Sequence, residues 1–263
     1  MFMAKYNVHG GHNPSGKIGS GACDLLDESI EDRLVCKAII KYLKAAGHTA
    51  YNCTCNNGTG QIDILRRICK KCNAHDVILD VSVHFNSGRN KHKSNGKPGG
   101  FEIWATNYNG IKKEVSERIV ANLKELGMNT HGDPYKKTSN LYYLNHTNAK
   151  AILLETEFVD DIDSKKIYKK IGYDKIGKAV AEAIIGRSID SKKVTVKPKA
   201  SSKFKSYKVK VTASALNIRK SASTSGTRVG SYKKGTTVTI KAVKNGWGKT
   251  SKGWIKLSYT KKC

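Results

Sequence analysis

Over the first 190 residues, apolar stretches of strand length alternate with longer stretches of helical period, and this alternation constrains the fold more than any other feature. The runs that resemble buried strands lie at 4–9, 48–54, 77–84, 101–106 and 151–157. The helical patterns lie at 29–46, 60–74, 111–127 and 174–186. Strands and helices that alternate in this way predict an α/β domain, with an open twisted sheet flanked by helices on both faces.

The pattern changes after residue 188. Residues 189–206 have no periodic apolar face and carry six lysines, which predicts a charged linker. Residues 207–263 consist of short alternating stretches separated by turn residues, which predicts a small all-β barrel. We therefore expect two domains, residues 1–188 and 207–263, joined by the basic linker 189–206.

Positive charge is concentrated in the C-terminal region. The chain has a formal net charge of +27, and residues 207–263 contain 14 Lys or Arg and no Asp or Glu. This asymmetry predicts that the C-terminal region binds a polyanion. Basic residues interleaved with aromatic residues would suit single-stranded nucleic acid. However, no nucleic-acid-reading motif is present, so nucleic acid is not the partner we expect.

Four residues form a candidate metal site. His12 and His84 follow predicted strands, Glu28 stands where a helical pattern begins, and Glu155 closes the apolar run 151–155. In open α/β sheets, ligands gather at the carboxyl ends of strands. Two imidazoles and a carboxylate are the ligands of a catalytic zinc site, and a second carboxylate provides the general base. The residues thus indicate a candidate zinc hydrolase.

The residues alone leave other choices open, because each of the four has a neighbour of similar chemistry or an ordinary structural explanation. The competing side chains are His9 for His12, Asp27 and Glu31 for Glu28, and Glu157 for Glu155. A single histidine after a strand is more often a hydrogen-bonded structural residue. A glutamate at a helix start is favoured by the helix dipole alone.

Longer motifs around these residues carry a family resemblance. Residues 5–187 resemble the zinc-dependent N-acetylmuramoyl-L-alanine amidases, the cell-wall hydrolases found among bacterial autolysins and phage endolysins. The matching pieces are Gly11-His12 at a strand end, Glu28 at the start of a long helix, SVHFN at 82–86 for the family's Ser-x-His-x-Asn, and LETEF at 154–158 for its Glu-x-x-Phe.

The resemblance implies an activity and a role for each residue. Zinc would bind His12, Glu28 and His84, and Glu155 would be the catalytic acid/base. The reaction would be hydrolysis of the amide bond between N-acetylmuramic acid and the L-alanine of the stem peptide. Asn86 is expected to contact the substrate or to support a residue that does. A non-catalytic cell-wall-binding protein is the alternative, but a complete set of ligands plus a base argues against it.

The C-terminal region resembles a bacterial SH3-like domain, a common cell-wall-targeting module. The resemblance rests on LNIRKSAST at 216–224, GWGKT at 246–250 and GWIKLSY at 253–259. It implies that residues 207–263 hold the enzyme on the peptidoglycan of a Gram-positive cell wall, with anionic wall polymers as additional partners. We expect a monomer.

The N-terminus predicts where the protein is made. MFMAKYNV runs into a strand without the apolar core of a signal peptide, and no apolar stretch of 18 residues could span a membrane. We therefore expect synthesis in the cytoplasm, with release to the cell wall through a holin pore, as for a phage endolysin. An autolysin whose leader is missing from this sequence is the alternative.

Seven cysteines occur in the chain. An odd number without a leader favours reduced thiols over a disulfide framework. Cys53, Cys55, Cys69 and Cys72 could in principle hold a structural zinc. Such sites usually have two C-x-x-C pairs and here only one pair has that spacing, so we expect free thiols.

Overall fold

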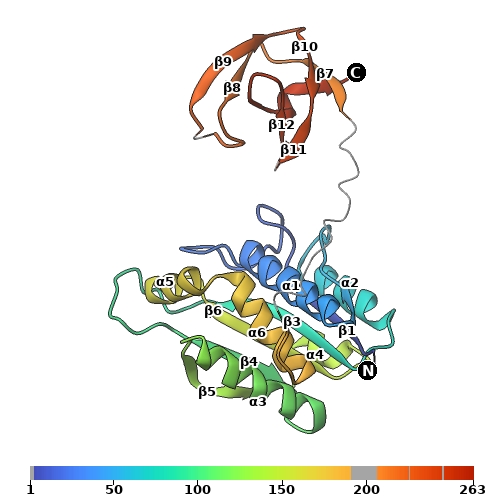
Figure 1. Ribbon diagram of the computed structural model, residues 1–263, viewed down its shortest axis with the longest axis vertical. Coiled ribbons are helices and arrows are strands. Elements are labelled where there is room, and N and C mark those ends of the chain that lie inside the picture. The colour runs from blue at the N-terminus through green and yellow to red at the C-terminus, as the bar shows by residue number, and fades with distance from the viewer. Residues whose placement is uncertain (1–2, 191–205, 225, 245) are drawn as a thin grey trace. The chain divides into compact units, whose positions relative to one another are not determined.

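The computed structural model describes residues 3–190, 206–224, 226–244 and 246–263 (Figure 1). It divides into two compact units, Met1–Thr195 and Val196–Cys263. Most of the predicted linker 189–206 lies outside the described residues, so the exact domain boundaries stay a prediction.

The N-terminal unit is built on a mixed sheet whose strand order is β2-β1-β3-β6-β4-β5. The strands are β1 (Lys5–Gly10), β2 (Thr49–Asn52), β3 (Leu79–Asn86), β4 (Phe101–Ala105), β5 (Thr130–Lys137) and β6 (Ala151–Phe158). Neighbouring strands are parallel except for β4 and β6, which pair antiparallel. The strands β1, β3 and β6 therefore bring their carboxyl ends to one edge of the sheet.

Helices cover both faces of this sheet (Figure 1). They are α1 (Glu28–Ala45), α2 (Gln61–Asn73), α3 (Gly110–Glu125), α4 (Tyr142–His146), α5 (Ile162–Ile171) and α6 (Tyr173–Ile185). Alternate residues of β6 enter two separate hydrophobic clusters. Ile152 and Leu154 pack in the cluster that contains residues of α1, α3 and α6, whereas Ala151 and Leu153 pack in the cluster of α2 and α4. The predicted α/β class is confirmed.

The C-terminal unit is a small antiparallel β domain, also as predicted. Its elements are β7 (Tyr207–Val211), β8 (Ala215–Arg219), β9 (Arg228–Lys233), β10 (Thr237–Ile240), β11 (Ala242–Lys244), β12 (Trp247–Lys249), β13 (Trp254–Lys256), η2 (Leu257–Tyr259) and β14 (Thr260–Lys262). They form two sheets, β10-β7-β14 and β11-β12-β13-β8-β9. Both sheets contribute side chains to a single buried cluster that includes Val209, Ile218 and Ile255.

Within the described part of the chain, no helix is both long enough and apolar enough to cross a bilayer.

Candidate metal centre and active site

The three predicted metal ligands come from three elements that meet at the carboxyl edge of the sheet. His12 lies two residues beyond β1, and His84 lies within β3, two residues before that strand ends. Glu28 is the first residue of α1, which begins there because the side chain of Asp27 caps the helix by accepting from the backbone N–H of Ile30. The region after β1, the strand β3 and the helix α1 thus each place one side chain at the carboxyl edge of the sheet.

Glycines leave room for these side chains. A Cβ atom on Gly11 would lie 1.8 Å from Cε1 of His84, so any larger residue would displace that ring. Gly21 has a φ of +76°, and a Cβ there would lie 2.4 Å from Oε2 of Glu28. Glycine is therefore needed at Gly21 both for its positive φ and for the space that the Glu28 side chain occupies, and at Gly11 for the space that the His84 ring occupies.

The ligand atoms converge closely. Nε2 of His12 lies 2.9 Å from Oε1 of Glu28, and Nδ1 of His84 lies 3.1 Å from the same oxygen. The two ring nitrogens are 3.1 Å apart. Among the described residues, this is the one group of three or more His, Cys, Asp or Glu side chains whose ligand atoms all lie within 4.8 Å. Two imidazoles and one carboxylate directed at a common point fit the requirements of zinc.

The protonation states also suit a cation. Burial opposes ionisation of Glu28, but hydrogen bonds with His12 and His84 outweigh it and hold the pKa of this carboxyl below its ordinary value. Burial lowers the pKa of His84. The site therefore offers an anionic carboxylate beside a neutral imidazole, and metal binding requires both forms.

Backbone groups fix the Glu28 carboxylate in place. The N–H of Phe85 donates to its Oε1 at 3.2 Å, and the N–H of Ala22 donates to its Oε2 at 2.8 Å. The loop that carries His12 is held by Arg33, whose Nη2 donates to the His12 carbonyl at 2.5 Å. These contacts orient two of the three ligands, as supporting groups around protein metal sites commonly do.

Glu155 lies beside this group in the sheet. On β6 it pairs in register with His84 on β3 and with Glu102 on β4. Its Oε2 is buried and has no hydrogen-bond partner among the described residues. Burial raises the pKa of Glu155 well above its ordinary value, and the charges of Glu28 and Glu102 raise it further. A carboxyl group with an unengaged oxygen and a high affinity for protons is well suited to transfer them.

Glu102 also lies at this site, although the sequence analysis did not predict it. It is buried on β4 and accepts hydrogen bonds from Nδ2 of Asn86 and Nε1 of Trp104, each at 2.9 Å. Asn86 thus holds a carboxylate that pairs in register with Glu155, and its expected supporting role stays a prediction. A charged residue inside the apolar run 101–106 was the available signal.

The competing side chains have structural partners instead. Glu31 accepts from Tyr168 Oη at 2.7 Å and from Lys169 Nζ at 2.5 Å. Asp27 caps α1, and Glu157 accepts from the N–H of Gly100 at 3.0 Å. His9 is buried and lies outside the convergent group. The convergent group thus excludes His9, Asp27 and Glu31, and the choice of Glu155 over Glu157 stays a prediction.

The cysteines form no comparable group. All seven are unlinked, and no cluster of thiolates among the described residues meets the same distance criterion. Cys53, Cys55, Cys69 and Cys72 are buried in the hydrophobic cluster of α2 and α4.

The sequence model described as N-acetylmuramoyl-L-alanine amidase matches residues 8–186. The chain belongs to this amidase family. The bacterial SH3 domain model matches residues 214–261, which confirms the predicted C-terminal domain.

Two curated relatives of this chain are uncharacterized proteins of Clostridium perfringens. One is 34% identical over 187 residues, which cover 71% of this chain and 53% of the relative. The other is 32% identical over 183 residues, which cover 68% of this chain and 50% of the relative. The chain thus spans about half the length of the curated relatives that it matches.

Solved structures share the amidase fold. The catalytic domain of the CD27L endolysin, which targets Clostridium difficile, has a TM-score of 0.61 at 21% identity and covers 71% of this chain and 99% of its own. The CwlD amidase of Clostridioides difficile, solved with the GerS lipoprotein, has a TM-score of 0.59 at 16% identity, with 70% and 97% covered. At these identities the likeness establishes the fold.

The buried Glu157 leads to a prediction about stability. Burial raises the pKa of Glu157 from 4.5 to about 7, although hydrogen bonds from Ser164 and Gly100 oppose this. Between these two pH values the folded chain binds a proton that the unfolded chain has lost, so the free energy of unfolding falls as pH rises. Glu157→Gln removes this dependence. Urea unfolding measures this effect. Between pH 5 and pH 8 the free energy of unfolding should fall by roughly 2–3 kcal/mol more in the wild type than in the variant.

The exposed Glu114 provides the control for this prediction, because Glu114→Gln should leave the wild-type profile unchanged. Parallel stability profiles for wild type and Glu157→Gln would contradict the assignment of a protonated Glu157.

Proposed function

We propose that this chain hydrolyses peptidoglycan at the amide bond between the lactyl group of N-acetylmuramic acid and L-alanine. His12, Glu28 and His84 would hold a zinc ion, and Glu155 would be the acid/base. The observation that carries the proposal is the convergence of these three ligand atoms, with Glu155 paired to His84 in the adjacent strand. Membership of the amidase family selects the substrate.

A zinc ion held by the three ligands would supply the Lewis acidity that activates water and polarises the scissile carbonyl. Glu155 takes a proton from the attacking water and later delivers it to the departing alanine nitrogen. Its raised proton affinity favours the first step, and the proton that it then holds is available to the alanine amine, which leaves only when it is protonated. Burial is the main cause of that affinity, and the charges of Glu28 and of Glu102, which accepts from Asn86, contribute to it.

We infer that the protein acts as a monomeric phage endolysin, made in the cytoplasm and released to a Gram-positive wall through a holin pore. The likeness to the catalytic domain of an endolysin supports this role, and both curated relatives come from a Gram-positive bacterium. An autolysin is the alternative role for the same chemistry.

The C-terminal domain would hold the enzyme on the wall. Lysines lie over aromatic rings of this domain, with Lys262 Nζ 5.1 Å from the centre of the Tyr207 ring and Lys256 Nζ 5.6 Å from that of Trp247. The domain contains no acidic residue, so its lysines and arginines present one sign of charge to an anionic wall polymer.

Truncation after residue 190 tests this targeting role. The truncated chain should bind purified sacculi more weakly than the full chain, and added salt should weaken its binding less, because the screened charges are gone. Sacculi stripped of anionic polymers provide the control, since full-length binding to them should also lose salt sensitivity. Equal binding by both chains under all conditions would rule out this role.

The activity itself is tested by digestion of Gram-positive sacculi with the full chain, followed by assay of new end groups. We expect new alanine amino groups without new reducing sugars, abolished by a chelator and restored by zinc. New reducing ends would identify a glycosidase instead. Binding without any new end group would favour the non-catalytic wall-binding protein.

A further inference from the structure

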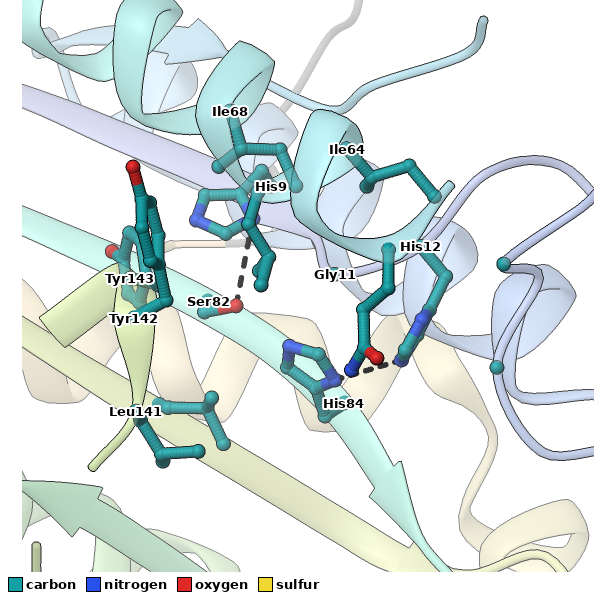
Figure 2. A pocket seen from close by; sticks show the side chains of 15 residues that line it. His9, Gly11, His12, Ile64, Ile68, Ser82, His84, Leu141, Tyr142 and Tyr143 are labelled. Atoms are coloured by element: carbon teal, nitrogen blue, oxygen red, sulfur yellow. Dashed lines mark hydrogen bonds between the residues drawn. The ribbon is translucent and has the colours of Figure 1, made fainter. Parts of the chain in front are cut away.

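The cavity beside the metal centre contains no lysine or arginine. It has a volume of about 290 Å³, and His12 and His84 line it together with apolar side chains such as Ile64 and Leu141 (Figure 2). None of the fifteen described residues that line it is Asp, Glu, Lys or Arg. Basic side chains that recognise an anionic part of the cell wall would therefore lie elsewhere in the chain.

A second cavity, of about 450 Å³, lies along β8 in the C-terminal domain. Leu216 and Ile218 of this strand belong to the buried cluster of the domain. Because side chains alternate along a strand, Ala215, Asn217 and Arg219 are directed to the opposite face, and all three line the cavity. We call this site the β8 cavity.

A second basic residue and two aromatic rings complete its lining. Trp247 on β12 pairs directly with Lys256 on β13, and Lys256 Nζ lies 5.6 Å from the centre of the Trp247 ring. The ring of Tyr259 belongs to a residue that is 52% exposed. Its backbone carbonyl accepts from the N–H of Thr212 at 3.0 Å, which holds Tyr259 beside the start of β8. Trp247, Lys256 and Tyr259 all line the cavity.

Arg219 and Lys256 are accessible and have no acidic side chain of the domain to pair with. Both residues are partly exposed, and residues 207–263 contain no Asp or Glu. Nη1 of Arg219 donates to the carbonyl of Gly226 at 2.7 Å, which orients the guanidinium and leaves it with further N–H donors. Two cations that line one cavity without a neutralising side chain indicate a site for an anion.

We propose that the β8 cavity binds a phosphodiester group of an anionic wall polymer. Arg219 and Lys256 would hold the phosphate oxygens, since guanidinium and ammonium groups both form strong charge-assisted hydrogen bonds with phosphate. The exposed ring of Tyr259 would contact the sugar or polyol next to that phosphate. The proposal rests on the proposed function, in which this domain holds the enzyme on the wall, and it assigns the residues and the ligand group.

The surroundings of β8 favour such a polymer over a stem peptide. The strand pairs with β13 on one side and with β9 on the other, so both of its sides are occupied and a peptide could not add to it as a further strand. The cavity extends along β8, from Ala213 before the strand to Thr224 after it, which suits a linear chain. A polymer with one phosphate in every repeat could also contact the lysines outside the cavity, whereas a stem peptide carries few carboxylates.

The test is calorimetry of the full chain with a synthetic glycerol phosphate oligomer at low salt. The variant Arg219→Gln/Lys256→Gln removes both cations of the β8 cavity. The matched control is Lys208→Gln/Arg228→Gln, which removes the same charge from exposed residues of the domain that lie outside the cavity. An oligoglutamate with the same number of charges and a stem tetrapeptide are titrated in parallel.

We expect the cavity variant to bind the glycerol phosphate oligomer about 10- to 100-fold more weakly than the wild type, the effect of losing charge-assisted hydrogen bonds. The control variant should lose less than about fivefold, because exposed charges contribute little individually. Equal losses in the two variants would mean that only net charge is read, and would overturn the proposal. It would also be overturned if the cavity variant lost affinity for the tetrapeptide, or for oligoglutamate, but not for the phosphate oligomer.

Arg219→Lys tests the same contact without a change of charge. Lysine keeps the apolar stem but lacks the planar guanidinium, which can contact two phosphate oxygens at once, so affinity for the oligomer should still fall several-fold. The Tm of each variant should match that of the wild type, which shows that a loss of affinity does not come from unfolding. Wild-type affinity in Arg219→Lys would contradict the assigned contact.

This proposal and the proposed function can fail separately. Calorimetry with the oligomer requires neither zinc nor bond cleavage, so it decides the β8 cavity even if sacculi release no alanine amino groups. If the wild type releases these groups but does not bind the oligomer, the cavity assignment falls and the amidase stands.

Discussion

Replacing Glu155 by Gln should lower kcat for the release of alanine amino groups by about 10²–10⁴-fold, the range expected for loss of a general acid/base. Glutamine keeps the shape of the side chain but can neither take a proton from water nor pass one to the leaving nitrogen. The measurement is kcat on sacculi together with zinc content, which should remain that of the wild type because Glu155 is not among the convergent ligand atoms.

The fold should tolerate this change. Oε2 of Glu155 has no hydrogen-bond partner among the described residues, so the substitution breaks no contact of that oxygen. It also removes a carboxyl group from the neighbourhood of Glu28 and Glu102.

Glu157→Gln is the matched control for catalysis. Glu157 is the same residue type on the same strand, and from the sequence alone it was the alternative candidate for the acid/base. Its activity should stay within a few-fold of wild type. If Glu155→Gln keeps more than a tenth of the wild-type kcat, Glu155 is not the catalytic acid/base.

The second large effect is expected from His84→Ala, which removes one of the three ligands. Loss of a group that merely supports a metal ligand typically weakens metal binding 10–100-fold, so loss of a ligand should weaken it more. We expect the purified variant to contain little zinc and to have background activity. Added zinc should raise the Tm of the wild type but not of the variant, because only the native wild-type site binds the metal.

His92→Ala provides the control for this variant. His92 is an exposed histidine paired with Asp24, away from the convergent group. It should keep the zinc content and activity of the wild type. Zinc bound by His84→Ala at wild-type stoichiometry would mean that the metal is held elsewhere in the chain.

Much of the fold could be predicted because apolar residues recur with the period of the strand or helix whose buried face they form. The runs at 4–9, 77–84 and 151–157 correspond to β1, β3 and β6, the strands that carry the site. The strand β5 was missed because it lies at the sheet edge and its sequence, THGDPYKK, is largely polar and contains a proline. The helix α4 was missed because five residues are too few to establish a helical period.

The candidate site was only partly accessible from the sequence. The three convergent ligands lie on separate elements, and the residues alone could not separate Glu28 from Glu31 or Glu155 from Glu157. The family motifs made that choice. In the structure, Glu31 accepts from Tyr168 and lies outside the convergent group, whereas the choice of Glu155 over Glu157 stays a prediction.

The central claim is that one metal ion at His12, Glu28 and His84 is required for amide hydrolysis. The most direct test is to titrate the metal-free full chain with zinc while following the release of alanine amino groups from sacculi. Activity should be absent without zinc, rise in proportion to it and saturate at one equivalent per chain. Full activity in the metal-free protein, or activity that does not respond to zinc, would contradict the account.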